Sequence, residues 1–440
     1  MGGRSGRDAM MRVWRSAADS ASAVSPDRNR VVDFLRAVSI VVVVIGHWLM
    51  AAPEVRPNGD LLAGHVLADV PWTQWLTWVF QVMPVFFMVG GYSNAASWRS
   101  ALRQGLGYES WVNARLRRLV IPVLALLAFW GVFASVLLLG GLDPELLLIG
   151  SQTALVPVWF LAVYIAVVAI TPLTIRVWER WGMRSILAGI VAAVAVDAVS
   201  LLLAESWVGW LNYLFVWGTV HQFGYAWRDG RLDGRVRWGL AAAGLGALVA
   251  LTQGLAYPVS MVGVPGAALN NTLPPRLPLL ALGAVQTGLL LGMERPLGRL
   301  LTRDGPWTAT VLVTSMIMTI YLWHLTTMVL VLAVLLALDG FGLHVVAGSG
   351  TWWATRPIWL LVMAGVTAPA VIPLARFERP KTRMAAPARW RGIIAVLSVC
   401  LGLALLAYFG VGGPDGLNWI ALSLPFVGAL VGGVVGWSGR

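Results

Sequence analysis

Cysteine and lysine are almost absent from this sequence. Its 440 residues include one cysteine, Cys400, and one lysine, Lys381, so arginine supplies nearly all of the basic charge. A single thiol excludes an internal disulfide and a metal centre built from several cysteines. Cys400 lies within an apolar run, and we interpret it as a small core residue. We expect no metal cofactor, and we infer a bacterial source from the arginine-rich composition.

Charged residues are scarce, at 12% of the chain, whereas hydrophobic residues make up 58%. This composition excludes an ordinary soluble globule and is typical of a polytopic membrane protein. The net charge of +12 would suit a nucleic-acid partner, but the basic residues fall in short clusters between apolar runs. Such clusters are the signature of cytoplasmic loops, so we expect no nucleic acid among the partners.

The first thirty residues have no apolar core and no small-residue cleavage site, so we expect them not to be a signal peptide. They are polar and arginine-rich, and we interpret residues 1–30 as a basic cytoplasmic tail. The longest predicted external connections, at about residues 50–75, 257–276 and 338–356, are too short for a soluble domain. Any catalysis must therefore occur within the helix bundle or at its rims.

Apolar runs close to the ~20 residues that cross a bilayer recur along the chain and predict an all-α, polytopic transmembrane helix bundle of about 12 spans. They lie at about 32–50, 75–97, 119–140, 157–175, 186–204, 210–227, 238–256, 277–293, 309–337, 357–374, 393–411 and 417–436. With the N-terminus inside, all of the 32 basic residues except Arg56, Arg276 and Arg356 fall on the cytoplasmic side. This asymmetry supports the predicted spans and predicts that both termini are cytoplasmic.

The first span, Val31–Met50, carries three ionisable side chains, Asp33, Arg36 and His47. Arg36 and His47 are 11 residues apart, which on an α-helix is three turns plus about 20°, with a rise of about 16 Å. Both side chains therefore share one face. Ionisable residues inside a membrane are costly and usually face a cavity or a polar partner. We interpret this face as a functional site rather than as the two ends of an ordinary span.

Three histidines fall within predicted spans: His47, His221 and His324. Counted from the predicted cytoplasmic starts of their spans, His47 and His324 each lie about 15 residues along, which predicts one shared depth. A neutral imidazole can accept a proton from a hydroxyl near neutral pH, so both are candidate catalytic residues. We interpret His221 as structural, and His65 and His344, in external connections, as solvated.

The stretch NARLRRLVIP at 113–122 places Arg115 and Arg118 three residues apart and therefore on one helical face. We expect a helix to begin here, with Pro122 in its first turns. Together with Arg36, these two forked guanidinium groups would bind a polyanion such as a diphosphate. Each of these arginines alone also fits the ordinary positive charge of a cytoplasmic rim.

Six short motifs follow one another along residues 30–380. They are the Arg36 and His47 pair after Asp33, FFMVGGY at 86–92, RLRRLVIP at 115–122, WFLAVY at 159–164, IYLWH at 320–324 and RFERP at 376–380. In this order they resemble the membrane-bound acyltransferase-3 family of integral membrane O- and N-acyltransferases. Two features depart from the common pattern. Gly90-Gly91-Tyr92 stands where Ser-Gly-Phe is usual, and two predicted spans follow the last motif with no soluble esterase-like domain.

The resemblance implies a ten-helix acyltransferase domain at 31–380, followed by two additional transmembrane helices at 381–440. It implies acetyl-CoA or another short acyl-CoA as co-substrate, and a hydroxyl or amine of a cell-envelope glycan, glycolipid or lipid as acceptor. It also implies a multi-pass position in the inner (plasma) membrane, with membrane lipids as neighbours and transfer at the outer side. Arg36 and His47 would be essential, and Arg115 and Arg118 would help to hold the acyl-CoA.

Two mechanisms fit these residues. His47 acts as general base on an acceptor that attacks the thioester directly, or His47 or His324 is transiently acylated as a nucleophile. Tyr321, Trp323 and Asn94 are candidate donors to the oxyanion on residue type alone. His324 also fits an interfacial position in an aromatic belt beside Tyr321 and Trp323.

Asp197 is a further charged residue inside a predicted span. It pairs either with His47 or His324, to fix a tautomer and hold an imidazolium, or with Asn212 or another structural donor. The sequence alone does not choose between these partners.

A transporter or flippase for an envelope lipid or glycan is the competing interpretation, with His47, His324 and Asp197 as a proton relay. It explains the buried titratable groups. However, it gives no role to the paired arginines, and the two halves of the chain do not share the broken-helix pattern of many transporters. A receptor or scaffold without chemistry is a third interpretation.

Overall fold

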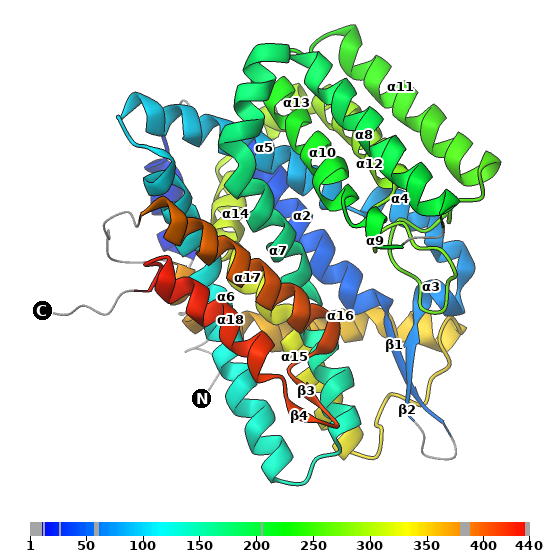
Figure 1. Cartoon of the computed structure of the whole chain (residues 1–440). Helices are drawn as coiled ribbons and strands as arrows, with labels where there is room; N and C mark the ends of the chain where they lie inside the picture. The colour runs from blue at the N-terminus through cyan, green and yellow to red at the C-terminus, as the bar shows by residue number, and fades with distance from the viewer. Residues whose placement is uncertain are drawn as a thin grey trace, which may run out of the picture. The chain divides into compact units, whose positions relative to one another are not determined.

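The computed structural model describes residues 11, 14–25, 28–56, 61–203, 206–378 and 388–435. Helices account for most of them (Figure 1). The strands of this part of the chain are two antiparallel pairs in connecting segments, β1 (Ala51–Val55) with β2 (Leu61–His65) and β3 (Gly412–Gly413) with β4 (Gly416–Leu417). The predicted helical fold class is confirmed. The end of the RFERP motif and the predicted domain boundary at 380 lie outside the described residues.

Within the described ranges, nine helices are long and apolar enough to cross a membrane. They are α2 (Arg30–Met50), α5 (Met83–Arg103) with the short turns before it, α6 (Tyr108–Leu139), α7 (Pro144–Trp181), α8 (Met183–Leu202), α11 (Arg235–Val249) with η2 (Ala250–Gly254), α15 (Ile317–Ala337), α16 (Gly350–Leu374) with η3 (Ala375–Glu378), and α17 (Arg389–Phe409). A tenth candidate is the pair α12 (Leu277–Gly292) and α13 (Glu294–Leu300), which is bent by 55°. The chain is therefore a multi-pass membrane protein.

Each of the predicted spans contains a helix, but some of these helices are short. α10 (Asn212–Arg228) has 17 residues and α18 (Trp419–Val431) has 13, fewer than a straight span needs. The smaller helices are α3 (Val66–Asp69), α4 (Thr77–Phe80), α9 (Ser206–Gly209) and α14 (Asp304–Ser315), with η1 (Pro71–Leu76). The predicted total of about 12 spans is not confirmed, and the cytoplasmic position of both termini stays a prediction.

The helices form two compact units, and each unit contains several separate stretches of the chain. The first unit comprises Met1–Val43, Gln74–Ala96 and Ile175–Ile317. The second comprises Val44–Thr73, Ser97–Thr174 and Met318–Arg440. Each boundary between these stretches that falls inside a helix divides it between the units, as happens in α2, α5, α7 and, at its first residue, α15.

In the first unit, α10 packs against α8 and α12, and α11 packs against α12 (Figure 1). α10 is buried along most of its length, and its Trp217, Phe223 and Tyr225 are among the largest fully buried side chains. A helix that is apolar on all sides is expected at the centre of a bundle rather than at its surface. The core of this unit therefore lies around α10.

Two glycines allow α5 and α10 to approach closely. A Cβ added at Gly91 would lie 1.8 Å from the carbonyl oxygen of His221, and one added at Gly224 would lie 2.0 Å from the carbonyl oxygen of Met88. Small residues at helix crossings are how membrane helices bring their backbones together. Gly91, the glycine that this chain shares with the usual Ser-Gly-Phe pattern, is therefore required by this packing.

In the second unit, α17 and α18 lie side by side and pack against α6 (Figure 1). Gly402 of α17 permits this contact, because a Cβ added there would lie 2.5 Å from Cδ of Pro425 on α18. The two helices that follow the predicted acyltransferase region are thus packed onto α6 of the same unit.

The connection after α2 is a hairpin held by histidines rather than a solvated loop. The ring nitrogens of His344 lie 3.0 Å from the carbonyl oxygens of both Val55 and Asp339. His65 is half-buried, and its Nδ1 accepts a hydrogen bond from the backbone N–H of Leu67, which caps α3. Burial lowers the pKa of His65, so the neutral ring that can accept this bond is favoured. The prediction that His65 is solvated is therefore wrong.

The predicted start of the helix that carries the arginine pair is also wrong. α6 begins at Tyr108, after the extended residue Gly107, with Glu109 in its first turn, where a negative charge is favourable. Pro122 therefore lies inside the helix. Because proline has no N–H, the carbonyl group of Arg118 lacks its usual partner in the helix.

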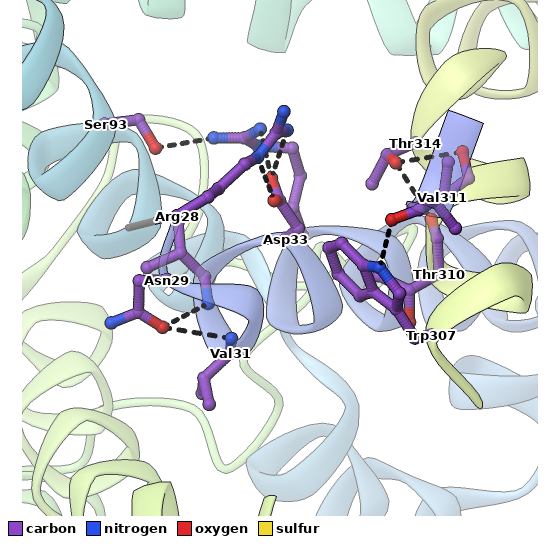
Figure 2. A network of polar contacts seen from close by, with 12 residues as sticks. Arg28, Asn29, Val31, Asp33, Ser93, Trp307, Thr310, Val311 and Thr314 are labelled. Atoms are coloured by element: carbon purple, nitrogen blue, oxygen red, sulfur yellow. Dashed lines mark hydrogen bonds and ion pairs between the residues drawn. The ribbon is translucent and has the colours of Figure 1, made fainter. Parts of the chain in front are cut away.

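The predicted span at 309–337 is interrupted near its N-terminal end. α14 ends at Ser315 and α15 begins at Ile317. The hydroxyls of Thr310, Thr314 and Ser315 donate to carbonyl groups three or four residues earlier, a pattern that bends helices. Figure 2 shows Thr310 and Thr314 in this arrangement.

Replacing Gly224 by alanine should destabilise the protein, because the new Cβ would force α5 and α10 apart. We expect a loss of about 1–3 kcal/mol, the usual cost of overpacking, measured by unfolding in detergent. Gly218→Ala on the same helix is the matched control, since no atom lies within 4 Å of a Cβ added there. Equal stability of the two variants would contradict the close crossing.

Candidate active site

His47 and His324 are in contact within the second unit. Nδ1 of His47 lies 2.8 Å from Nε2 of His324, and the two rings are nearly parallel, with 9° between their planes. His324 is fully buried, whereas His47 is half-buried. The structure thus brings together the two histidines that the sequence predicts at one depth, although the break before α15 shortens the helix that carries His324.

The hydrogen bonds assign a tautomer to each ring. Nδ1 of His324 lies 2.7 Å from the carbonyl oxygen of Tyr321, and a carbonyl only accepts, so this nitrogen carries a proton. Nε2 of a neutral His324 must then accept from the N–H at Nδ1 of His47. The lone pair of His47 therefore lies on Nε2. This nitrogen is the basic atom at the end of a series of hydrogen bonds that runs from the Tyr321 carbonyl group through His324 to His47.

Further contacts fix the backbone of His324. The indole N–H of Trp48 donates to the carbonyl oxygen of His324 at 3.2 Å, and the hydroxyl of Thr327 donates to the same oxygen at 2.9 Å. Thr327 also contacts Thr367 of α16 at 2.8 Å. Sequence reasoning missed these residues, because a threonine or tryptophan next to a histidine carries no signal of its own. They restrain the ring that orients His47.

Tyr321 and Trp323 have structural contacts beside the pair. The hydroxyl of Tyr321 donates to the carbonyl oxygen of Pro157 at 2.9 Å, so its single proton is engaged with α7. The ring of Trp323 packs on Phe129, with 5.2 Å between centroids. The role of Tyr321 that this geometry supports is to supply the carbonyl group that holds His324.

Asn94 pairs with His221 in the first unit. Its Nδ2 lies 3.1 Å from Nε2 of His221, and both side chains are buried. Tyr225 contacts the same ring edge to face. This closed cluster agrees with the structural interpretation of His221.

Arg36 belongs to a second cluster, also in the first unit, around the buried carboxylate of Asp33. Nη2 of Arg36 donates to the hydroxyl of Ser93 at 2.6 Å, and Nη1 lies 3.4 Å from Asp33. Arg28 donates to Asp33 through both Nε and Nη2, at 2.5 and 2.9 Å (Figure 2). Two guanidinium groups thus share the carboxylate of Asp33.

Arg28 is the member of this cluster that sequence reasoning missed. Its side chain is 52% exposed, whereas that of Arg36 is 21% exposed. The hydrogen bonds to Asp33 raise the pKa of Arg28, so it stays charged. Asn29 caps α2 by accepting from the backbone N–H of Val31, which holds Arg28 at the helix start. Its position just before α2 could have indicated it, but no pattern in the sequence points to Ser93, 57 residues from Arg36.

The arginines of α6 lie in the second unit. The guanidinium group of Arg115 lies over the ring of Trp111, 5.6 Å from its centroid. Arg118 is exposed and acts electrostatically on Glu378, whereas Arg117 between them is buried. Arg115 and Arg118 are thus placed on α6 as predicted, and their role toward a ligand stays a prediction.

Asp197 is held by structural donors rather than by a histidine. Its carboxylate accepts from Arg276 at 2.6 Å, from the hydroxyl of Tyr257 at 3.0 Å and from the backbone N–H of Leu277 at 3.1 Å. Asp197 and Arg276 are both buried. Burial, reinforced by the charge of Asp197, raises the pKa of Tyr257, so its hydroxyl remains a donor. Of the two open interpretations, these contacts support the structural one, with a donor other than Asn212.

Among the described residues, no three histidine, cysteine, aspartate or glutamate side chains group in a way that could hold a metal ion. The expectation that the protein needs no metal stays a prediction.

Asp197→Ala should lower the free energy of unfolding by about 3–5 kcal/mol, because it leaves the Arg276 charge buried and unpaired. Asp233→Ala, which removes an exposed carboxylate from the same unit, should change it by less than about 0.5 kcal/mol. Denaturation of the purified protein in detergent measures both. Similar stabilities would show that the Asp197 ion pair does not hold the first unit together.

Comparison with known families shows the family to which this chain belongs. A family model described as an acyltransferase domain, that of the acyltransferase-3 family, matches residues 29–376. The match covers most of the chain and contains every site residue that the sequence predicted, whereas Arg28 lies just before it. Searches of curated proteins and of solved structures found no match. The chain therefore belongs to the acyltransferase-3 family of membrane acyltransferases.

Proposed function

We propose that this protein moves a short acyl group, such as acetyl, from cytoplasmic acyl-CoA to a hydroxyl or amine of a cell-envelope glycan, glycolipid or lipid. Transfer would occur at the outer side of the inner membrane. The observation that carries the proposal is the His47 and His324 pair, in which the hydrogen bonds leave the lone pair on Nε2 of the half-buried His47. A base with a partner that fixes its tautomer is the arrangement used for proton transfer in acyl-transfer enzymes.

His47 acts as the general base in this mechanism. Its Nε2 takes the proton of the acceptor hydroxyl as the oxygen attacks the carbonyl carbon of the thioester. When the carbon–sulfur bond breaks, the imidazolium of His47 returns that proton to the departing thiolate. The proton balance is closed, and no further reactant is required.

His324 orients His47 and spreads its positive charge. Both of its ring nitrogens are hydrogen-bonded, one to the Tyr321 carbonyl and one to His47. A nucleophile needs a lone pair that faces its substrate. If an acyl-histidine forms, this geometry favours His47 over His324 as its site.

The cluster of Arg28 and Arg36 around Asp33 supports acyl-CoA as the donor. Arg28 and Arg36 present guanidinium groups, which bind phosphate oxygens in a forked geometry. α2 is continuous from Arg36 to His47, so its rise of about 16 Å separates the cation from the base. The extended pantetheine arm of a CoA thioester covers a comparable length. Arg115 and Arg118 are the second candidate site for the donor phosphates.

His47→Ala should lower acyl transfer by a factor of about 10² to 10⁴, the range for a lost general base, with little loss of stability. His47→Gln should be equally inactive because an amide cannot take the proton. His324→Ala should cost less, since it removes only the orienting partner, and Asp233→Ala, which removes an exposed side chain of the first unit, is the control. Transfer of labelled acetyl from acetyl-CoA in native membrane vesicles measures all four. Wild-type acyl transfer by folded His47→Ala protein would contradict the mechanism. Equal losses of transfer in His47→Ala and His324→Ala would indicate that His324 acts as a nucleophile.

Alanine at Arg36, Arg115 or Arg118 should weaken acyl-CoA binding by about 1.5–3 kcal/mol for each lost charge-assisted contact. Lysine at the same position should restore only part of the lost acyl-CoA binding, because its ammonium group lacks the forked N–H donors of a guanidinium group. The thermal shift of the detergent-purified protein with millimolar CoA measures binding, and Arg184→Ala, at an exposed arginine of α8, is the control. A wild-type protein that shows no shift with CoA or acetyl-CoA would favour a carrier over an acyltransferase.

A further inference from the structure

The break between α14 and α15 creates a helix start in an apolar segment. The first N–H groups of any helix have no partner within it. At the start of α15 these groups belong to residues that follow Met316, and the side chain of Thr319 is only 1% exposed. Water therefore does not accept hydrogen bonds from these N–H groups, so a protein group must accept them.

Glu378 supplies that group from η3. Its Oε1 accepts from both the backbone N–H and the hydroxyl of Thr319, each at 2.6 Å. The backbone N–H of Met318 gives a further hydrogen bond to the same side chain. A carboxylate is the favoured partner for a helix N-terminus because of the helix dipole. Glu378 thus caps α15 although it lies 59 residues away from Thr319 in sequence.

The capped turn is the one that positions the candidate active site. Tyr321, whose carbonyl oxygen holds Nδ1 of His324, follows Thr319 by two residues. His324 itself follows by five residues, which is about 7.5 Å along the helix. Any shift of this first turn would move the acceptor and the ring together.

Arg118 of α6 lies close enough to act on the charge of Glu378, and η3 packs against α6. The side chain of Arg118 is exposed, whereas that of Glu378 is half-buried. The glutamate of the RFERP motif therefore has a defined place between α6 and α15.

We propose that Glu378 is a positioning residue for acyl transfer. By capping α15, it holds the Tyr321 carbonyl and His324 in the register that keeps the lone pair of His47 on Nε2. The proposal rests on the proposed function of His47 as base, but its structural step can be tested without acyl transfer.

The experiment compares Glu378→Ala with Glu378→Gln in the full-length protein. The first reading is the turnover and KM for acetyl-CoA in native membrane vesicles. The second is the rate at which diethyl pyrocarbonate modifies His47 in detergent, followed by mass spectrometry, which reports the nucleophilicity of that ring directly. Glu145→Ala is the control, since it removes an exposed glutamate from the first turn of α7.

Glu378→Ala should lower turnover between about tenfold and 10²-fold, the effect of a misplacement of about 1 Å, with KM within twofold of wild type. His47 modification should slow in parallel. Glu378→Gln should recover most of both, because its amide oxygen accepts the same hydrogen bonds. If Glu378→Ala does not fold, Thr319→Ala replaces it, with a smaller loss in the same direction, and Thr319→Ser should restore the wild-type values.

Unchanged turnover and unchanged His47 modification in folded Glu378→Ala would overturn the proposal. A glutamine variant as impaired as alanine would also overturn it, because it would assign a role to the charge rather than to the cap. A rise in KM alone would do so too, since it would place Glu378 in donor binding through Arg118. If wild-type protein transfers no acetyl group, the proposed function fails, while the rate of His47 modification still decides whether Glu378 positions the ring.

Discussion

Polar groups inside an apolar helix bundle must find their hydrogen-bond partners within the protein, because no water reaches them. Three clusters among the described residues illustrate this constraint: Asp197 with Arg276, Asn94 with His221, and Glu378 with Thr319. The helices are arranged so that each cluster closes, and the glycine crossing of α5 and α10 brings the backbones near enough for one of them. The same constraint fixes the tautomer of His47, because the N–H at its Nδ1 needs an acceptor, and Nε2 of His324 is that acceptor.

Two of the histidines inside the helices, His221 and His47, differ in their surroundings. These surroundings show why His221 is structural and why His47 is a candidate for catalysis. His221 is 1% exposed, and its Nε2 faces an amide of a neighbouring helix. His47 is half-buried, and the chain of hydrogen bonds through His324 ends on its Nε2. A general base needs both a fixed tautomer and an accessible lone pair. Only the geometry around each ring distinguishes these two cases.

The family match ends at residue 376, just before the glutamate that caps α15. Beyond it, α17 and α18 pack against α6, the helix that carries Arg115 and Arg118. These two helices therefore support one of the candidate donor sites from outside the matched region. The two helices also pack on each other, because Gly402 of α17 lets Pro425 of α18 approach within contact distance.

The sequence by itself determined what depends on neighbours along the chain. Apolar run length predicted the helices, and helical periodicity predicted that Arg36 and His47 share a face. Only the tertiary structure decided the partners. Asp197 lies 79 residues from Arg276, and His47 lies 277 residues from His324, so no local pattern relates them. The break at Met316 also escaped prediction, because the group that caps the new helix start, Glu378, lies 59 residues from Thr319 in sequence. Periodicity is a local property, whereas the choice of a buried polar partner depends on how distant helices pack.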